Sequence, residues 1–166
     1  MLNSGMDVSL RRPVTALDFS LYFDLRWRIL RERWTSDRES GKDEHEEHAV
    51  HLMAFVDNHL FGVGRLNFNT PTEGRIRYMA VESAFSGLGV GSAILRKLEQ
   101  VAKDNGATTL VLNARESVVP FYQKHGYFVS GTADKLFGSI VHWQMSKNLD
   151  LIEPLPFPQT SPRLNK

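Results

Sequence analysis

The stretch that decides the fold of this chain is Ser86-Gly87-Leu88-Gly89-Val90-Gly91-Ser92. It follows a predicted strand over residues 75–81 and precedes a predicted helix over residues 90–105. Glycine at every second position lets a ligand come close to the backbone, because no Cβ stands in the way. The free amides of the first helical turn, together with the helix dipole, favour an anion at this place. The stretch therefore predicts a cradle for a diphosphate.

Two common phosphate-binding motifs do not fit this stretch. A Walker loop needs Lys followed by Ser or Thr after its last glycine, whereas Ser92-Ala93 follows here. A dinucleotide-binding fingerprint needs the pattern Gly-x-Gly-x-x-Gly, and the third glycine here has a different spacing. The sequence therefore disfavours both hydrolysis of a nucleoside triphosphate and binding of a dinucleotide.

The composition is typical of an ordinary globular protein. The chain of 166 residues fits one domain, and its apolar fraction of 42% suffices for a core. The formal net charge of +1 gives no argument for nucleic acid or a membrane surface as a partner. The absence of cysteine excludes disulfides, thiolate metal sites and a cysteine nucleophile. Because the sequence shows neither a membrane-spanning apolar run nor the pattern of a signal peptide, we expect a cytoplasmic location.

The hydrophobic pattern predicts alternating strands and helices. Strands are predicted at residues 8–12, 50–56, 60–68, 75–81, 108–112, 127–129 and 140–146, and helices at 15–34, 90–105 and 118–125. The polar segment 35–48 is a loop or a short helix. In the first helix, apolar residues at helical spacing predict a buried face made of Leu17, Leu21, Leu25 and Ile29. This order predicts an α/β (α+β mixed) fold, with helices flanking a mixed sheet.

A second motif lies at residues 112–127, which read Leu-Asn-Ala-Arg-Glu-Ser-Val-Val-Pro-Phe-Tyr-Gln-Lys-His-Gly-Tyr. With the strand end Tyr78-Met79-Ala80-Val81 and the glycine stretch, it resembles the GNAT superfamily of acyl-CoA N-acyltransferases. In that family a strand ends at Asn, a helix carries Phe-Tyr, and a Gly-Phe or Gly-Tyr pair follows. The family's pyrophosphate loop reads Arg/Gln-x-x-Gly-x-Gly/Ala, which Gly89 and Gly91 match and Ser86 does not. Three flanking segments, at residues 43–44, 51–55 and 136–145, resemble one group of bacterial GNAT proteins without an assigned substrate.

The resemblance implies the GNAT fold, a twisted, mixed and mostly antiparallel sheet of six to seven strands flanked by helices. It implies a single acetyltransferase domain over residues 1–149. The remaining residues, 150–166, are rich in proline and are interpreted as an extended or disordered tail. Proteins of this family are often dimers, so a homodimer is a further expectation.

The resemblance also implies an activity, the transfer of an acetyl group from acetyl-CoA to a primary amine by direct attack in a ternary complex. No metal is implied. Backbone groups of Met79, Ala80 and Val81 would meet the pantetheine arm and the acyl carbonyl. The pyrophosphate would lie on Ser86, Gly87, Leu88, Gly89, Val90, Gly91 and Ser92. Asn113 matches a position that contacts the coenzyme or a bound water. Tyr122 matches a tyrosine that contacts the coenzyme and protonates the leaving thiolate.

This chemistry also needs a base, because the attacking amine must lose a proton. Three residues are candidates, either directly or through water: Glu44, Glu116 and His142. A phenol with a pKa of about 10 can act as the acid toward a thiolate with a pKa of about 8–9 when it lies close by. No covalent enzyme intermediate is required, in agreement with the absence of cysteine.

Two polar clusters allow other interpretations. His45-Glu46-Glu47-His48 with His51 suggests a metal site, but the two outer histidines of the run are three positions apart rather than four, so a solvated charged loop is favoured. The basic run Arg26, Arg28, Arg31 and Arg33 suggests nucleic acid, but the balanced charge favours an ordinary helix. A less favoured interpretation is that Arg26 or Arg31 holds the carboxylate of an anionic acceptor.

Two other functions stay open at the level of the sequence. Ser86 in place of Arg or Gln is compatible with a non-catalytic acyl-CoA-binding or regulatory module. An open groove in place of a closed pocket would favour a protein or peptide N-terminal acetyltransferase over an enzyme for small molecules.

Overall fold

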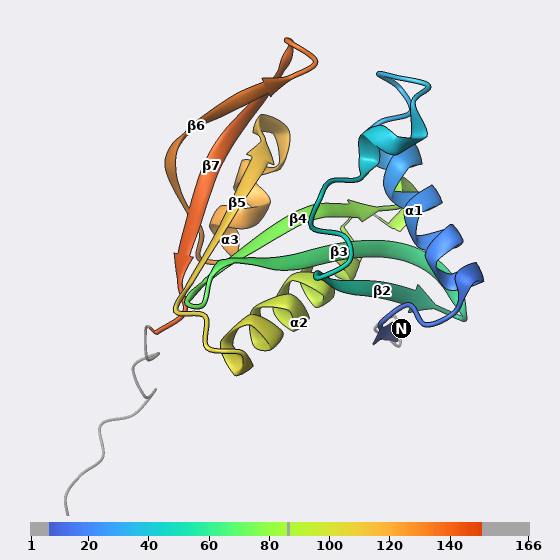
Figure 1. Ribbon diagram of the computed structural model, residues 1–166, viewed down its shortest axis with the longest axis horizontal. Helices are drawn as coiled ribbons and strands as arrows, with labels where there is room; N and C mark the ends of the chain where they lie inside the picture. The colour runs from blue at the N-terminus through green and yellow to red at the C-terminus, as the bar shows by residue number, and fades with distance from the viewer. Residues whose placement is uncertain (1–6, 86, 151–166) are drawn as a thin grey trace, which may run out of the picture.

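The computed structural model describes residues 7–85 and 87–150 and shows one seven-stranded sheet in the order β1-β2-β3-β4-β5-β7-β6 (Figure 1). Its strands are β1 (Val8–Arg11), β2 (Val50–Val56), β3 (His59–Thr70), β4 (Glu73–Val81), β5 (Thr109–Arg115), β6 (Phe128–Leu136) and β7 (Ile140–Asn148). Neighbouring strands are antiparallel except β4 and β5, which run parallel. The mixed, mostly antiparallel sheet confirms the predicted fold class.

Helices cover both faces of the sheet. They are α1 (Ala16–Leu30), α2 (Val90–Asp104) and α3 (Val119–Lys124), with short 3-10 turns η1 (Arg38–Gly41), η2 (Ser83–Phe85) and η3 (Glu116–Val118). On β2, Leu52 and Ala54 belong to the core around α2, whereas Met53 belongs to the core under α1. Because successive residues of a strand point to opposite faces, α1 and α2 lie on opposite sides of the sheet.

The parallel strands β4 and β5 separate soon after they pair. Their register covers only Glu73–Arg75 opposite Thr109–Val111. Beyond that point the two strands run apart, which Figure 1 shows as a gap between the β1–β4 half of the sheet and the β5–β7 half. The backbone edge of β4 over residues 76–81 is therefore not paired with β5, although β3 pairs with its other edge. Strand edges that lack a neighbouring strand can bind a ligand through their backbone groups.

Helix α2 packs closely on β3 because the strand residues beneath it, Gly62 and Gly64, have no side chain. A Cβ on Gly62 would lie 2.8 Å from Ile94 Cδ1, and one on Gly64 would lie 2.7 Å from Ile94 Cγ2. Ile94 and Leu98 are fully buried. The predicted helix over 90–105 is confirmed.

Replacing Leu98 with alanine is expected to lower the free energy of unfolding by about 2–5 kcal/mol, because a fully buried leucine leaves a cavity in close-packed surroundings. Chemical denaturation of both proteins measures this difference. Leu88→Ala is the control, since Leu88 is exposed on the glycine turn and its removal should change stability little. Equal stability of Leu98→Ala and the wild type would contradict the packing described here.

The predicted buried face of α1 was partly wrong. Leu25 is buried, but Leu17 is 67% exposed and Leu21 is 46% exposed. The helix instead buries Tyr22 and Arg26 beside Leu25. Its start is as expected, because Thr15 and Asp18 form a reciprocal capping box.

Several boundaries also differ from the expectations. Helix α1 ends at Leu30, short of the predicted end at residue 34, and segment 35–48 contains only the short turn η1. Strand β6 runs to Leu136, so the last two strands form a longer hairpin than predicted, closed by a turn at Phe137 and Gly138 with positive φ. Ser86 and the proline-rich tail beyond Asp150 lie outside the described residues. None of the helices in the described ranges has the length and apolar character needed to cross a membrane.

Candidate functional site

The glycine turn leads directly into α2. Gly87 and Gly89 adopt φ angles of +82° and +87°, and a Cβ on either would meet no atom within 4 Å. Gly89 is the N-cap of α2 and has no side chain that could cap the helix. The first-turn amides of Val90, Gly91 and Ser92 are therefore left for a ligand, beside open space and at the positive end of the helix dipole. These features fit the diphosphate cradle that the sequence predicts.

Gly91 joins the turn to the other parts of the site. A Cβ at this position would lie 3.4 Å from the ring of Phe121 on α3 and 3.7 Å from Val81 Cγ2 at the end of β4. The glycine turn, the unpaired end of β4 and helix α3 thus meet at one place. Met79 and Val81 are partly buried there, and Ala80 is buried.

Tyr78 introduces an irregularity into β4 immediately before this end. Its φ of +57° is unusual for a bulky residue, and the register with β3 shifts between Val63 and Arg65. One extra residue on β4 opposite β3 is a β-bulge, which bends the strand and redirects the residues that follow it. The bulge therefore helps β4 to turn away from β5, and it leaves the backbone edge of Met79, Ala80 and Val81 unpaired on the side of β5.

A buried ionic cluster holds the Tyr78 ring. The guanidinium carbons of Arg26 and Arg65 lie 4.1 and 4.9 Å from the ring centroid. Arg65 donates to Asp43 at 2.6 and 2.9 Å and to Glu46 at 2.7 Å, and Arg26 pairs with Glu46 as well. Burial alone would raise the pKa of Asp43, but hydrogen bonds from Arg65 and the His45 amide lower it to about 2.

The prediction that residues 45–48 form a solvated charged loop holds for His45, Glu47 and His48, which are exposed. It is wrong for Glu46, which is the shared carboxylate of two buried arginines. The basic run starts on an ordinary helix, as predicted, but Arg26 is fully buried. The sequence contained one clue, a charged residue, Arg65, within the apolar run over 60–68. Charged residues are almost never fully buried unless they are paired.

Replacing Arg65 with methionine is expected to lower the free energy of unfolding by about 3–5 kcal/mol, because Asp43 and Glu46 would remain at a partly buried site without their main cation. Thermal or chemical unfolding measures the loss. The matched control is Arg38→Met, which breaks an exposed ion pair with Asp24 and should have a much smaller effect. Similar losses in the two variants would contradict the role assigned to the cluster.

Tyr122 lies on α3 in a stack of aromatic rings, with centroids 5.0 Å from Phe121 and 5.7 Å from Tyr127. Its side chain is buried, and its hydroxyl makes no hydrogen bond with any residue that the structure describes. Burial raises the pKa of Tyr122 above its usual value. The phenol is therefore protonated at neutral pH and has a proton to give.

His142 lies on β7 directly opposite Arg115 of β5. Its Nδ1 is 2.9 Å from the carbonyl oxygen of Ile140. A carbonyl only accepts, so Nδ1 carries the hydrogen and Nε2 of the neutral ring keeps its lone pair. Burial, together with the charges of Arg115, Arg31 and Arg77, lowers the pKa of His142 below its usual value. The imidazole is thus neutral near pH 7 and able to accept a proton.

The other residues proposed from the sequence lie in more open positions. Glu44 has a side chain that is 81% exposed and contacts His45 at 3.4 Å. Glu116 is exposed in η3. Asn113 is exposed on β5, opposite Gln144 and two residues before Arg115, so it shares a face with Arg115 and His142. Reasoning from the sequence missed Arg115 as a neighbour of His142, because only the strand register brings the two residues together.

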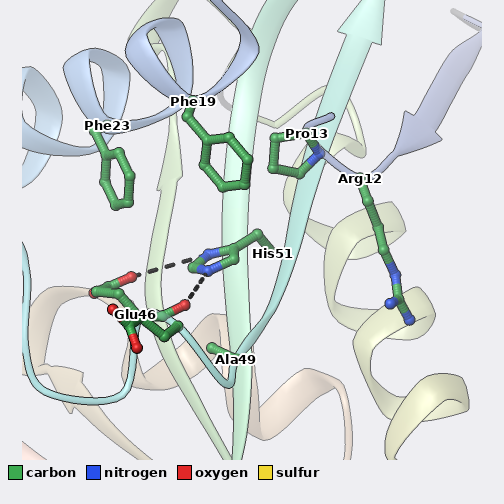
Figure 2. A pocket seen from close by; sticks show the side chains of 8 residues that line it. Arg12, Pro13, Phe19, Phe23, Glu46, Ala49 and His51 are labelled. Carbon is green, nitrogen blue, oxygen red and sulfur yellow. Dashed lines mark hydrogen bonds and ion pairs between the residues drawn. The ribbon is translucent and has the colours of Figure 1, made fainter. Parts of the chain in front are cut away.

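A separate hollow of about 420 Å³ lies over β2, where Phe19 and Phe23 lie beside His51 (Figure 2). His51 Nε2 contacts the Glu46 carbonyl at 2.7 Å, and Nδ1 contacts the Tyr22 hydroxyl at 2.9 Å. Strand β3 separates β2 from β4, so this hollow is distinct from the gap between β4 and β5. Across residues 7–85 and 87–150, no three His, Asp or Glu side chains are grouped as a metal site would need.

Comparison with known proteins agrees with this geometry. Residues 19–127 match the Acetyltransferase (GNAT) family. YjcF of Bacillus subtilis, an uncharacterized N-acetyltransferase, is 34% identical over 110 residues, which cover 66% of this chain and 78% of that protein. The crystal structure of a proposed N-acetyltransferase from Lactobacillus plantarum superimposes with a TM-score of 0.75 at 17% identity, covering 86% of this chain and 98% of that one.

A third similar protein has a ligand bound. It is an aminoglycoside 6'-N-acetyltransferase in complex with coenzyme A, with a TM-score of 0.71 at 17% identity, covering 92% of this chain and 99% of that one. Three findings lead to one conclusion: the chain matches the family over most of the described residues, it has a relative in Bacillus subtilis, and it shares the fold of these structures. The chain belongs to the GNAT acetyltransferase family, whose members transfer acyl groups from acyl-CoA to amines.

Proposed function

We propose that this protein is an N-acetyltransferase that moves an acetyl group from acetyl-CoA to a primary amine by direct attack in a ternary complex. One observation supports the proposal most directly. The glycine turn, the unpaired end of β4 and the helix that bears Tyr122 come together at Gly91. A diphosphate cradle, a free strand edge and a protonated phenol are the parts that an acyl-CoA thioester requires.

The residues present fit the donor. The open space at Gly87 and Gly89 leaves room for a diphosphate against the amides of residues 90–92. Beyond the turn, the edge of β4 over Met79, Ala80 and Val81 offers amides and carbonyls to an extended pantetheine arm, as an added strand would use them. A bound acetyl-CoA supplies the thioester, and a β4 amide stabilises the oxyanion that develops on its carbonyl.

Two side chains transfer the protons of the reaction, one as base and one as acid. His142, neutral and with Nε2 unprotonated, takes the proton that the amine loses as the C–N bond forms. Tyr122 gives its hydroxyl proton to the thiolate as the C–S bond breaks. The products are an N-acetyl amine and free coenzyme A, and solvent restores both protonation states. Glu44 and Glu116 remain secondary candidates for the base, and each is far more exposed than His142.

The pH profile tests the base. We expect kcat/KM to rise with pH along an acid limb whose midpoint lies below 6.5, because the enzyme is active when His142 is neutral and its pKa is lowered from that value. In His142→Gln this limb should disappear and kcat/KM at neutral pH should fall about 100-fold. His59→Gln, at an exposed histidine of β3, is the control. An unchanged acid limb in His142→Gln would remove His142 from the mechanism.

The overall function is tested by following release of free thiol from acetyl-CoA with a panel of primary amines. The panel includes amino acids, amino acid amides, polyamines, an aminoglycoside and peptides with a free N-terminus. Amine-dependent release, with the N-acetyl product identified by mass spectrometry, supports the proposal. Hydrolysis of acetyl-CoA at a rate that no amine increases would contradict it and favour a binding or regulatory module. A preference for peptides alone would favour an N-terminal acetyltransferase.

A further inference from the structure

Two arginines from distant parts of the chain converge beside the proposed base. Arg31 caps the C-terminus of α1, and Arg115 ends β5. Arg31 Nη1 donates to the carbonyl oxygen of Leu30 at 3.1 Å, and Arg115 Nη2 donates to the same oxygen at 2.7 Å. Arg31 is only 7% exposed, and Arg115 is partly buried. Two guanidinium groups therefore share one backbone acceptor in a place with little water.

Neither arginine forms an ion pair with a carboxylate among the residues that the structure describes. The remaining bond of Arg31 goes to the carbonyl oxygen of Ser40 at 3.3 Å. The fully buried arginines nearby differ, because Arg26 pairs with Glu46 and Arg65 pairs with both Asp43 and Glu46. A desolvated charge without a counter-ion is unfavourable. Planar guanidinium groups with free donors match a carboxylate in geometry.

The pair lies beside the ends of α1 and β5, on the face of the sheet that α1 covers. Leu112 and Ala114 of β5 face the core around α2, so Arg115 points to the opposite face, where it reaches α1. On that face its cross-strand neighbour is His142. Arg31 also lies 5.7 Å from the centroid of Tyr78, the residue that precedes the free end of β4. The uncompensated positive charge is thus adjacent to both the proposed base and the proposed thioester site.

We propose that Arg31 and Arg115 bind the carboxylate of the acceptor, so that the substrates of this enzyme are small primary amines that carry a carboxylate, such as amino acids. This inference rests on the proposed function. The carboxylate would replace solvent on the two guanidinium groups and bring the amino group of the same molecule toward His142. The C–N bond forms, the C–S bond breaks, the amine proton passes to His142, and the carboxylate is unchanged in the product. Polycationic acceptors, the aminoglycosides included, would be repelled.

Kinetics with matched acceptors test the inference. Each amino acid is compared with its amide, which keeps the amine and loses the negative charge. We expect the wild type to favour the acid, and Arg115→Gln to raise KM for the acid by about 10-fold to 100-fold. In the same variant, kcat for the acid and all constants for the amide should change little at a pH well above 6.5, where His142 is neutral with or without the charge of Arg115. Arg12→Gln, at an exposed arginine beside β1, is the control and should behave as the wild type. Arg31→Gln should repeat the effect of Arg115→Gln.

A binding measurement separates this inference from the proposed function. Isothermal titration calorimetry measures the affinity of the protein for the N-acetyl amino acids that the reaction would form, without any turnover. Weaker binding to Arg115→Gln than to the wild type, with unchanged affinity for acetyl-CoA, supports the carboxylate site even if no amine is acetylated. Equal use of acids and amides, or no binding of these products by the wild type, overturns it. Transfer to amides alone would overturn this inference and leave the proposed function intact.

Discussion

Replacing Gly89 with tryptophan is expected to weaken acetyl-CoA binding at least 100-fold, which corresponds to about 2.7 kcal/mol. Gly89 caps α2 with a φ of +87° and borders open space. An indole there would occupy the place proposed for the diphosphate and cover the first-turn amides. Calorimetric titration of the variant with acetyl-CoA measures the effect.

Gly106→Trp is the matched control for this variant. Gly106 lies just beyond the other end of α2 and has a similar φ of +93°, so both variants carry the same kind of backbone strain, of order 1–2 kcal/mol. Only the residue at the N-terminus of α2 should affect the coenzyme. Equal affinities of Gly89→Trp and the wild type, or equal weakening in both variants, would contradict the position assigned to the diphosphate.

Replacing Tyr122 with phenylalanine is expected to lower kcat by 100-fold or more while the affinity for acetyl-CoA stays the same. The hydroxyl makes no hydrogen bond with the described residues, so its removal should not lower the stability. Its loss takes away the proton for the leaving thiolate, and general acids contribute about 10²–10⁴ to a rate. Steady-state kinetics and thermal unfolding of the same preparation measure both quantities.

Tyr127→Phe gives the opposite combination and serves as the control. Tyr127 belongs to the same aromatic stack, but its hydroxyl donates to Glu99 Oε1 at 3.0 Å. Its removal should lower the free energy of unfolding by about 1 kcal/mol and leave kcat unchanged. A wild-type kcat for Tyr122→Phe would exclude Tyr122 as the acid. Equal loss of kcat in both variants would indicate a general effect of the stack.

The sequence predicted those parts of the molecule that local patterns determine. The glycine turn, α2 and the strands β2 and β3 follow from turn residues and hydrophobic period, and the structure has them as expected. The resemblance to the GNAT family also supplied the fold, including the mostly antiparallel sheet. The separation of β4 from β5 has no local signature, because it depends on a bulge at Tyr78 that the surrounding charges stabilise.

Predictions failed where residues far apart in the sequence form pairs. Periodicity predicted that Leu17 and Leu21 lie in the core. The helix instead buries Tyr22 and Arg26, because Tyr22 contacts His51 and Arg26 pairs with Glu46. The proposed acceptor site could not be predicted for the same reason, since its residues are also far apart in the sequence. Arg115 belongs to the second motif in the sequence, but only the register of β5 with β7 places it opposite His142. A single sequence does not reveal such long-range pairs.

The measurement that tests the central claim most directly is isothermal titration of the purified protein with acetyl-CoA, with free coenzyme A and ATP as comparisons. We expect micromolar affinity for acetyl-CoA and coenzyme A and none for ATP, because the glycine turn and the free edge of β4 together fit a diphosphate that carries a pantetheine arm. No binding of acetyl-CoA, or binding of ATP at equal strength, would contradict the proposal that this site holds an acyl-CoA donor.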